Sequence, residues 1–272
     1  MVAFPNCKIN LGLNILQKRE DGYHDIETVF FPLPFTDALE IITSQNETQF
    51  KNTGILAGDT ENNLCLKAYR LLKNDYPQLP EINMHLHKAI PIGAGLGGGS
   101  ADATFTLLLL NRKYELNISD SKLSGYALQL GSDCPFFLLN NPCLATGRGE
   151  KMEEIVLSLA AYKILIVNPG FHVNTREIFQ QIKPVFPFKK IKEIIQQPVD
   201  TWRNELNNDF EKVVFSLHPE IEKIKEILYQ HKAIYASMTG TGSTVYGIFN
   251  KEADIKIPTE KKYFNRWIGK LS

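Results

Sequence analysis

The feature that most constrains this chain is a glycine-rich stretch that runs from Pro91 to Thr104. It reads Pro-Ile-Gly-Ala-Gly-Leu-Gly-Gly-Gly-Ser-Ala-Asp-Ala-Thr and places five of the chain's 18 glycines within seven residues. Glycine lets successive backbone N–H groups point at an anion with no Cβ in the way, and a helix beginning at Ser100 would add its positive N-terminal end. The stretch therefore predicts a phosphate-binding loop in an enzyme that uses a nucleotide.

Composition sets the size of the core and limits the partners. With 272 residues, 43% of them hydrophobic and 22% charged, the chain is long enough for one large domain or two of ordinary size, and we expect two. Thirty basic and thirty acidic side chains give a formal charge of zero. Such a chain has no overall attraction for nucleic acid or an anionic membrane, so any anion must be bound locally.

The cysteines and the N-terminus indicate the compartment. The four cysteines show no CxxC spacing, and the first residues lack the apolar core of a signal peptide. The apolar run 105–110 is far too short to span a bilayer. We expect a soluble, cytoplasmic protein with reduced thiols.

Hydrophobic periodicity predicts an α+β chain in the first half of the sequence. Extended segments are expected over 3–16, over 23–43 as two strands, and over 82–87, and helices over 63–72 and 120–130. Ser100 is the expected N-cap of a helix that ends near residue 112. Pro135 disfavours continued helix, so the apolar residues 136–139 are predicted to form a strand.

The second half of the chain is also predicted to contain strands and helices, after a turn at 147–150. A strand is expected over 162–168, a helix beginning near 174–175, a Pro- and Lys-rich loop over 183–198, and a helix over 219–231. We expect the boundary between two domains near residues 150–160, which gives domains 1–155 and 156–272.

Other classes of nucleotide-binding protein fit the glycine stretch less well. It contains no GxxxxGK[ST], because no lysine follows the glycines, so a P-loop NTPase is excluded, and the chain lacks the HRD and DFG elements of protein kinases. The residues from Gly93 to Gly98 match GxGxxG, but no parallel strand precedes Glu115 or Asp120, the acidic residues at a suitable distance. A dinucleotide-dependent oxidoreductase stays open as the alternative from another class.

Three separated blocks of sequence resemble the GHMP small-molecule kinase superfamily. The first is Asn-Cys-Lys-Ile-Asn-Leu at 6–11 followed by Asp-Gly-Tyr-His at 21–24, the second is the glycine stretch from Pro91 to Ala103, and the third is Thr-Gly-Thr-Gly-Ser at 239–243. The first block points to the branch that acts on 4-diphosphocytidyl-2-C-methyl-D-erythritol rather than on mevalonate, homoserine or galactose. The resemblance extends from residue 5 to about residue 250.

The resemblance implies a fold and a reaction. The fold would be the two-domain α+β GHMP kinase fold, with an N-terminal part like ribosomal protein S5 domain 2, a C-terminal ferredoxin-like part, and the active site between them. The reaction would be transfer of the γ-phosphoryl group of ATP to the 2-hydroxyl of 4-diphosphocytidyl-2-C-methyl-D-erythritol, in the non-mevalonate pathway to isopentenyl diphosphate. Another GHMP-type small-molecule kinase is the nearer alternative.

Three residues are implied at the reacting hydroxyl. Asp133, in the segment 131–137, corresponds to the family's catalytic aspartate and would act as general base, and Lys8 corresponds to the lysine that pairs with it and polarises the hydroxyl. A carboxylate beside an ammonium keeps a low pKa, so Asp133 would act mainly through its position. Lys8 and Asn10 share a face of one predicted strand, and Asn10 is an implied substrate contact.

A second group of residues is implied in substrate binding. Tyr23 and His24 would recognise the cytosine by ring stacking and hydrogen bonding, which suits a neutral base. Phe30, Thr175 and Phe179 match positions that line the same pocket. The third block would allow a close backbone approach that supports the glycine loop or the substrate phosphates, through Gly240 and Gly242.

ATP is the implied co-substrate. Adenine would lie near Asn63 and Lys88, and the phosphates would be bound by the glycine loop: Pro91, Ile92, Gly93, Ala94, Gly95, Leu96, Gly97, Gly98, Gly99, Ser100 and Ala101. Two positions in or after the loop depart from the family pattern. Ala94 replaces a frequent glycine, which is tolerable at negative φ, and Asp102 replaces a frequent asparagine. We expect Asp102 to stabilise the helix N-terminus or to help a metal ion indirectly.

The sequence predicts no resident metal site. It has no cluster of carboxylates for a metal, so Mg²⁺ would arrive with ATP. His85 and His87 project to one side of a strand, but no third ligand is near in sequence, and a polar strand face is the expected role. The small-molecule substrate is the expected partner, with no nucleic acid or membrane, and the chain is expected as a monomer or weak homodimer.

Overall fold

The computed structural model describes residues 1–55, 62–253, 257–258, 260, 262–269 and 271. Contacts divide the chain into two compact units. Unit 1 comprises Met1–Cys7, Phe35–Ile92 and Gly97–Asn140, and unit 2 comprises Lys8–Pro34, Gly93–Leu96 and Asn141–Ser272. The glycine loop therefore contributes to both units, because residues 93–96 belong to unit 2 and the residues on either side belong to unit 1.

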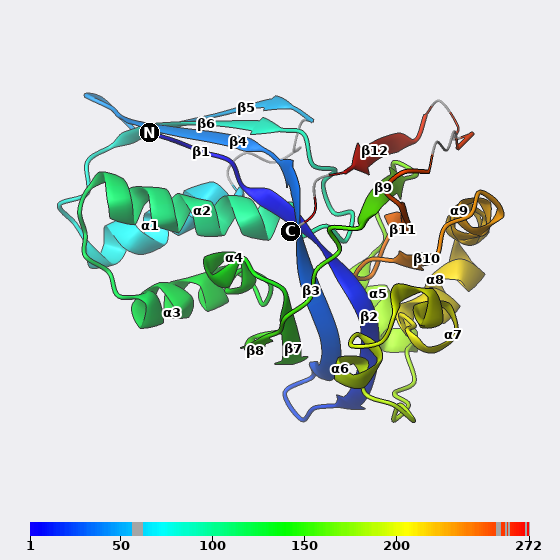
Figure 1. The fold of residues 1–272 in the computed structure, drawn as a ribbon. Coiled ribbons are helices and arrows are strands. Elements are labelled where there is room, and N and C mark those ends of the chain that lie inside the picture. Colours follow the sequence, from blue (N-terminus) through cyan, green and yellow to red (C-terminus); the bar gives the residue numbers. More distant parts are fainter. Residues whose placement is uncertain (56–61, 254–256, 259, 261, 270, 272) are drawn as a thin grey trace. The chain divides into compact units, whose positions relative to one another are not determined.

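Unit 1 is a sheet with helices on one face (Figure 1). Its strand order is β1-β4-β6-β5, in which β5 and β6 are parallel and the other neighbours are antiparallel. The strands are β1 (Val2–Ala3), β4 (Ala38–Thr43), β5 (Gln49–Gly54) and β6 (Ile82–Lys88). The helices are α1 (Leu64–Asp75), α2 (Gly98–Lys113), α3 (Asp120–Leu130) and α4 (Phe136–Leu139).

The alternation of apolar and polar residues along β6 explains which side of this strand packs against the helices. Ile82, Met84 and Leu86 are buried and join the core formed with α1, α2 and α3, whereas the intervening residues are more exposed. The Asn63 side chain caps α1 by accepting a hydrogen bond from the Cys65 N–H at 2.8 Å. The predicted strand over 82–87 and the helices over 63–72 and 120–130 are confirmed.

Two local predictions in unit 1 are wrong. Helix α2 begins at Gly98 and not after Ser100, because Gly97 adopts the left-handed conformation (φ 70°) and serves as the N-cap without a side chain. Residues 136–139 form the short helix α4 and not a strand. Pro135 has φ −59° and ψ −27°, so it ends the preceding turn in a conformation from which a helix can begin.

Unit 2 contains two sheets. The first has the order β2-β3-β7-β8, and the second has the order β10-β11-β9-β12, in which all pairs are antiparallel. The strands of the first sheet are β2 (Asn6–Lys18), β3 (His24–Thr36), β7 (Cys143–Gly147) and β8 (Lys151–Glu154). Those of the second are β9 (Tyr162–Asn168), β10 (Tyr235–Met238), β11 (Val245–Asn250) and β12 (Phe264–Ile268).

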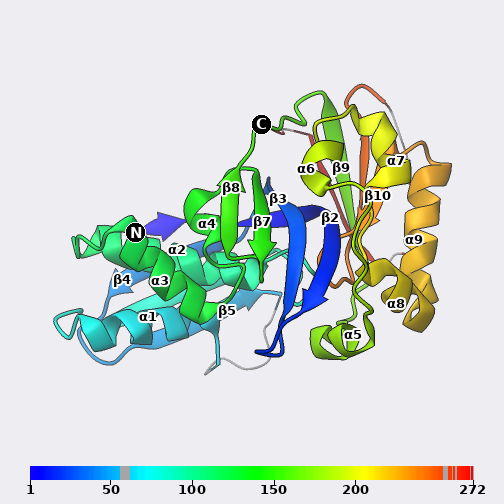
Figure 2. The ribbon, with the colours of Figure 1, turned by 90° about the horizontal axis from the view of Figure 1, so that it is seen from below.

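The helices of unit 2 are α5 (Thr175–Gln181), α6 (Ile191–Ile194), α7 (Trp202–Glu205), α8 (Phe210–Leu217), α9 (Pro219–Gln230) and the 3-10 helix η1 (Val199–Thr201). Helices α7 and α9 pack on the second sheet, and α8 packs against α9 (Figure 2). Ile221, Ile224 and Leu228 of α9 are buried on one face, as their spacing predicts. The predicted loop over 183–198 is wrong at 191–194, where buried Ile191 and Ile194 anchor α6.

The topology also decides between classes of nucleotide-binding protein. In a dinucleotide-binding unit a parallel strand follows the helix after the glycine loop. Here α2 is followed by α3, and the strands that pair with β6, antiparallel β4 and parallel β5, both come before β6 in the chain. The oxidoreductase alternative is therefore wrong for this fold. Among the described residues, no helix is long and apolar enough to cross a membrane.

Candidate active site

Lys8 and Asn10 lie side by side on β2, as their spacing predicts. The Lys8 ammonium donates a hydrogen bond of 2.7 Å to Asn10 Oδ1 and lies 4.7 Å from the centroid of the Phe30 ring. Asn10 Nδ2 donates to Thr28 Oγ1 at 3.0 Å. Lys8 is only 3% exposed and Asn10 only 2%. A buried cation held in one place by an amide and a ring can stabilise negative charge on a bound oxygen.

Unit 2 brings the three sequence blocks together around Thr239. The backbone N–H of Asn10 donates to Thr239 Oγ1 at 3.0 Å, and the Thr239 hydroxyl donates to the carbonyl oxygen of Gly95 at 3.0 Å. The Lys8 N–H donates to the carbonyl oxygen of Leu96 at 2.9 Å. Thr239, about 230 positions from the N-terminal block, and the Lys8 N–H thus fix the backbone of residues 93–96 beside Lys8.

Glycine is required at two positions of this segment. Gly95 has φ +78°, and a Cβ there would lie 2.1 Å from the carbonyl oxygen of Thr239. Gly93 has φ +61°, and a Cβ there would lie 2.5 Å from Nδ1 of His172, whose ring nitrogen is 3.0 Å from the Gly93 oxygen. Ala94 keeps a negative φ, which satisfies the condition for an alanine in the loop.

The third block is held by amide side chains that sequence reasoning missed. Asn208 Nδ2 donates to the carbonyl oxygens of Met238 (2.8 Å) and Gly240 (2.9 Å). Asn168 Nδ2 donates to the hydroxyls of Ser243 (3.1 Å) and Thr244 (3.0 Å). Lone asparagines carry no motif, so only the fold identifies them as supports of this block.

The predicted cytosine residues His24 and Phe179 lie together in unit 2. Their rings stack with centroids 5.1 Å apart, and Phe179 packs edge-on against Phe210 at 4.9 Å. Burial, with a smaller contribution from nearby Lys18, lowers the pKa of His24 below its usual 6.5. The imidazole is therefore neutral at physiological pH and offers one donor and one acceptor.

Tyr23 is half exposed and is backed by an arginine that sequence reasoning did not select. The guanidinium of Arg148 lies 3.7 Å from the centroid of the Tyr23 ring. Arg148 comes from the turn between β7 and β8, where its backbone N–H donates to Glu150. A planar cation against one ring face fixes the tyrosine and directs its other face outward.

The three remaining predicted substrate residues lie in or beside the third block. The hydroxyls of Thr175 and Thr241 are 2.9 Å apart and share a hydrogen bond. A Cβ on Gly240 would lie 3.3 Å from the Gly95 Cα, so this glycine allows the two glycine segments to approach. Gly242 has φ +91° and packs against the sulfur of Met238.

Unit 1 holds the C-terminal part of the glycine loop and the segment of Asp133. Gly98, Gly99 and Ser100 form the first turn of α2, so their N–H groups have no acceptor within the helix and can bind an anion. The Ser100 hydroxyl is 3.9 Å from where a Cβ on Gly131 would stand. Half-buried Asp133 follows two residues later, so the segment that carries Asp133 lies beside the first turn of α2 at Gly131.

The neighbouring Cys134 is a structural residue. Its carbonyl oxygen accepts a hydrogen bond of 2.8 Å from the Thr104 hydroxyl, which ties the segment to α2. Burial raises the pKa of the Cys134 thiol to about 11, so it stays protonated and unreactive at neutral pH.

The residues predicted near adenine have different surroundings within unit 1. Asn63 caps α1, with its Oδ1 occupied by the Cys65 N–H. Lys88 is 4% exposed, and its ammonium donates to the carboxylates of Asp37 and Asp102. The predicted helix-terminus role of Asp102 is wrong, because α2 begins earlier than expected and places Asp102 in its second turn, paired with Lys88.

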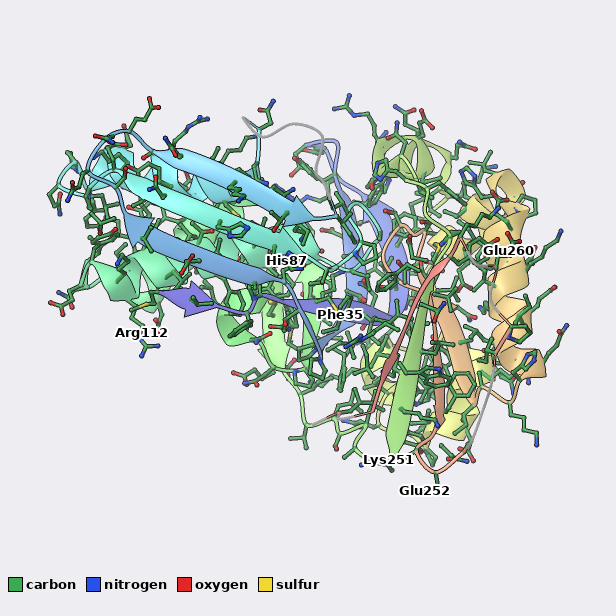
Figure 3. All side chains as sticks on the ribbon, turned by 90° about the horizontal axis from the view of Figure 1, so that it is seen from above. Phe35, His87, Arg112, Lys251, Glu252 and Glu260 are labelled. Carbon is green, nitrogen blue, oxygen red and sulfur yellow. The ribbon has the colours of Figure 1, made fainter. Side chains whose placement is uncertain are left out.

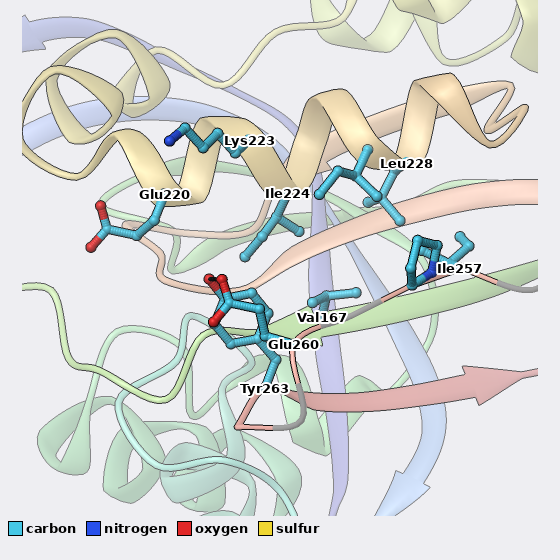
Figure 4. Close-up of a pocket in the computed structure, with 10 residues that line it drawn as sticks. Val167, Glu220, Lys223, Ile224, Leu228, Ile257, Glu260 and Tyr263 are labelled. Atoms are coloured by element: carbon cyan, nitrogen blue, oxygen red, sulfur yellow. Dashed lines mark hydrogen bonds between the residues drawn. The ribbon is translucent and has the colours of Figure 1, made fainter.

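Two further features lie apart from these residues. The rings of His85 and His87 share the hydroxyl of Thr53 on the exposed side of β6 (Figure 3), and the described chain holds no group of three or more ligand residues suited to a metal ion. A cavity of about 180 Å³ lies between α9 and the segment before β12 (Figure 4). None of the residues that line it is a predicted site residue.

Comparisons with known proteins identify the family of the chain. The family model described as GHMP kinases N terminal domain matches residues 63–141, and the one described as GHMP kinases C terminal matches residues 190–258. A Bacteroides fragilis protein described as 4-diphosphocytidyl-2-C-methyl-D-erythritol kinase is 51% identical over 260 residues, which is 94% of each chain. One of the same description from Parabacteroides distasonis is 48% identical over the full length of both chains.

A solved structure extends the similarity to the whole fold. The crystal structure of 4-(cytidine 5'-diphospho)-2C-methyl-D-erythritol kinase matches with a TM-score of 0.79 at 29% identity, over 91% of this chain and 90% of that one. The match to the Parabacteroides distasonis protein covers the whole chain, and therefore all three sequence blocks. The chain therefore belongs to the GHMP kinases, and within them to the 4-diphosphocytidyl-2-C-methyl-D-erythritol kinase family.

Proposed function

We propose that this chain transfers the γ-phosphoryl group of ATP to the 2-hydroxyl of 4-diphosphocytidyl-2-C-methyl-D-erythritol, with the 2-phosphate and ADP as products. The observation that carries the proposal is the hydrogen-bonded junction of Lys8, Asn10, Gly95 and Thr239, which joins an activating cation to a phosphate-binding loop. The names of relatives about half identical over nearly the full chain supply the substrate.

The chemical step needs one base and one cation. The 2-hydroxyl gives its proton to the Asp133 carboxylate while its oxygen bonds to the γ-phosphorus. The bond from that phosphorus to the bridging oxygen breaks, and ADP leaves. Lys8 stabilises the negative charge on the attacking oxygen, and Asn10 fixes the ammonium. Because the transition state is loose, the position of Asp133 matters more than its basicity.

ATP is the co-substrate, and its phosphates are proposed to lie against the glycine loop. The N–H groups of Gly98, Gly99 and Ser100 and the positive end of α2 favour negative charge there. Mg²⁺ is proposed to arrive with ATP and to offset the charge of the triphosphate. Asn63 is proposed as an adenine contact.

The acceptor is proposed to be recognised through its base. Tyr23 stacks on the cytosine, and neutral His24 donates to and accepts from its edge, supported by the stacked Phe179. Phe30, Thr175, Gly240 and Gly242 are proposed to line or support the remainder of the substrate site.

Some expectations stay predictions beside this proposal. The division into domains 1–155 and 156–272 is one, and the two matched family segments fall on either side of residue 155. A monomer or weak homodimer and a cytoplasmic location are others.

A direct assay tests the proposal. The purified chain is incubated with ATP, Mg²⁺ and 4-diphosphocytidyl-2-C-methyl-D-erythritol, and ADP release and the product mass are followed. Parallel reactions contain mevalonate or homoserine as acceptor. We expect phosphorylated product only with the cytidine compound. Product from another acceptor alone would identify a different GHMP kinase, and no product from any acceptor would reject the proposal.

A further inference from the structure

Unit 1 contains a buried cluster of three charged side chains on three elements. Asp37 lies immediately before β4, Lys88 ends β6, and Asp102 lies in the second turn of α2. The Lys88 ammonium donates to Oδ2 of Asp37 and, at 2.7 Å, to Oδ2 of Asp102. The exposed fraction of each residue is 4% or less. Long-lived contacts are expected of such a cluster, because water cannot replace them.

The cluster also forms hydrogen bonds with the backbone that leads into the glycine loop. Asp37 Oδ1 accepts hydrogen bonds from the N–H groups of Ala89 (2.6 Å) and Ile90 (2.9 Å), one and two residues before Pro91. Charge-assisted hydrogen bonds to two successive N–H groups hold this segment in one conformation.

The residues that follow the loop are packed against the same cluster. A Cβ on Gly98 would lie 3.3 Å from the Lys88 ammonium and 2.9 Å from Cγ2 of Ile90. One turn further along α2, the Asp102 carboxylate holds Lys88. The backbone before the loop and the helix after it therefore meet at one ammonium group.

The cluster sets two carboxyl groups against one ammonium group. Two carboxylates face Lys88, and Oδ1 of Asp102 is buried with no hydrogen-bond partner among the described residues. Burial and the nearby Asp37 raise the pKa of Asp102 to about 7, against the opposing effect of Lys88. The Cys65 thiol faces the group from α1, but its own pKa is raised by burial and it stays neutral.

We propose that Asp37, Lys88 and Asp102 are positioning residues, which hold the two ends of the glycine loop in the conformation that binds the phosphates of ATP. Lys88 then serves the nucleotide through the loop and not by direct contact of its ammonium with adenine. This inference rests on the proposed function for the identity of the nucleotide.

The test compares Asp102→Ala with Asp102→Asn. Alanine removes the acceptor that links α2 to Lys88, whereas asparagine keeps an oxygen at that place. We expect Asp102→Ala to raise the Kd of a non-hydrolysable ATP analogue and the KM for ATP by about tenfold, with the KM for the acceptor within about twofold of wild type. We expect Asp102→Asn to restore both values to within about threefold at about pH 8.

A control and a second readout keep structural damage apart from loop positioning. Asp75→Asn removes an ion-paired carboxylate of unit 1 that contacts Tyr126 and Lys122 at the far end of α1, and it should leave both Kd and KM unchanged. Hydrogen exchange of the segment 89–102 should be faster in Asp102→Ala without analogue. A folded Asp102→Ala variant with unchanged analogue binding overturns the inference, as does an equal rise in both KM values.

The binding and exchange measurements do not depend on turnover. A wild-type chain that binds the ATP analogue and phosphorylates no acceptor would reject the proposed function and leave this inference to be decided by the variants. A wild-type chain that is active while Asp102→Ala binds ATP normally would reject the inference alone.

Discussion

Thr239 and Gly95 are separated by 144 residues, and the Thr239 hydroxyl donates a hydrogen bond of 3.0 Å to the Gly95 carbonyl oxygen. The same hydroxyl accepts from the Asn10 N–H at 3.0 Å. One threonine thus fixes both the strand that carries Lys8 and the glycine loop. A carbonyl turned toward Thr239 cannot face a bound phosphate, so this bond favours an arrangement in which the loop presents its N–H groups to the anion.

Gly95→Ala tests that close approach. The new Cβ would stand 2.1 Å from the Thr239 carbonyl oxygen at φ +78°, so the loop and the third block must separate. We expect kcat/KM for ATP to fall by about a hundredfold or more, with a lower melting temperature. Steady-state kinetics and thermal unfolding of the purified variant provide the measurement.

Gly125→Ala is the matched control. Gly125 lies inside α3, and a Cβ there meets nothing within 4 Å. Alanine should raise the free energy of unfolding by about 0.5–1 kcal/mol and leave kcat unchanged. Equal loss of activity in both variants would contradict the specific role of Gly95.

Asp133→Asn tests the proposed base. The amide keeps the shape of the side chain but cannot take the proton, so we expect kcat to fall by about a hundredfold or more with both KM values little changed. If Lys8 and Asp133 act on the same hydroxyl, the double variant Lys8→Met, Asp133→Asn should lose less kcat than the product of the fold-losses of the two single variants. Undiminished turnover of Asp133→Asn would remove Asp133 from the mechanism.

Much of the fold could be predicted because the relevant signals are local. The alternation of Ile82, Met84 and Leu86 needs only a sheet with one covered face, and the pairing of Lys8 with Asn10 follows from strand geometry. The three blocks could be recognised as parts of one site by resemblance, and their hydrogen bonds through Thr239 confirm that unit 2 brings them together.

What could not be predicted depends on partners far away in sequence. The start of α2 is set by Gly97 in the left-handed conformation, which no residue pattern distinguishes from its glycine neighbours. The sequence predicts that Asp102 stabilises the helix end or helps a metal ion indirectly, because acids favour the first turn of a helix. The helix-end role is wrong, because Asp102 lies in the second turn of α2 and pairs with buried Lys88. Arg148 has no motif at all, and only the approach of β3 and β7 brings it to Tyr23.

The pH dependence of stability tests the environment of Asp102. Its pKa is raised from 3.8 to about 7. Between these two pH values Asp102 is protonated in the folded chain and ionised in the unfolded chain. Stability from this group therefore falls as the pH rises from about 4 to about 7. Asp102→Asn removes the dependence, so the melting temperature of the variant relative to wild type should rise between about pH 5 and about pH 8. A constant difference across this range would contradict the raised pKa.

His24 should show the opposite behaviour. Burial lowers its pKa below 6.5, so the folded chain holds it neutral where the unfolded chain begins to protonate, and stability from this group is lost as the pH falls through the folded value. We expect the KM for the acceptor to be flat from about pH 8 to about pH 6.5 and to rise on further acidification. His24→Gln keeps a donor and an acceptor but does not titrate, so the rise of the acceptor KM at acid pH should disappear in this variant. A rise that persists in His24→Gln would come from another group.

Arg148 is expected to act on the acceptor through Tyr23. Its guanidinium lies 3.7 Å from the centroid of a ring that is 51% exposed, so the stacking fixes a side chain that solvent alone would leave mobile. We expect Arg148→Met to raise the KM for the acceptor by about three- to tenfold and to leave the KM for ATP unchanged, with Arg148→Lys between the two. In a Tyr23→Ala background Arg148→Met should have no further effect, because the ring through which it acts is gone. A rise of the same size in both backgrounds would mean that Arg148 contacts the acceptor independently of Tyr23.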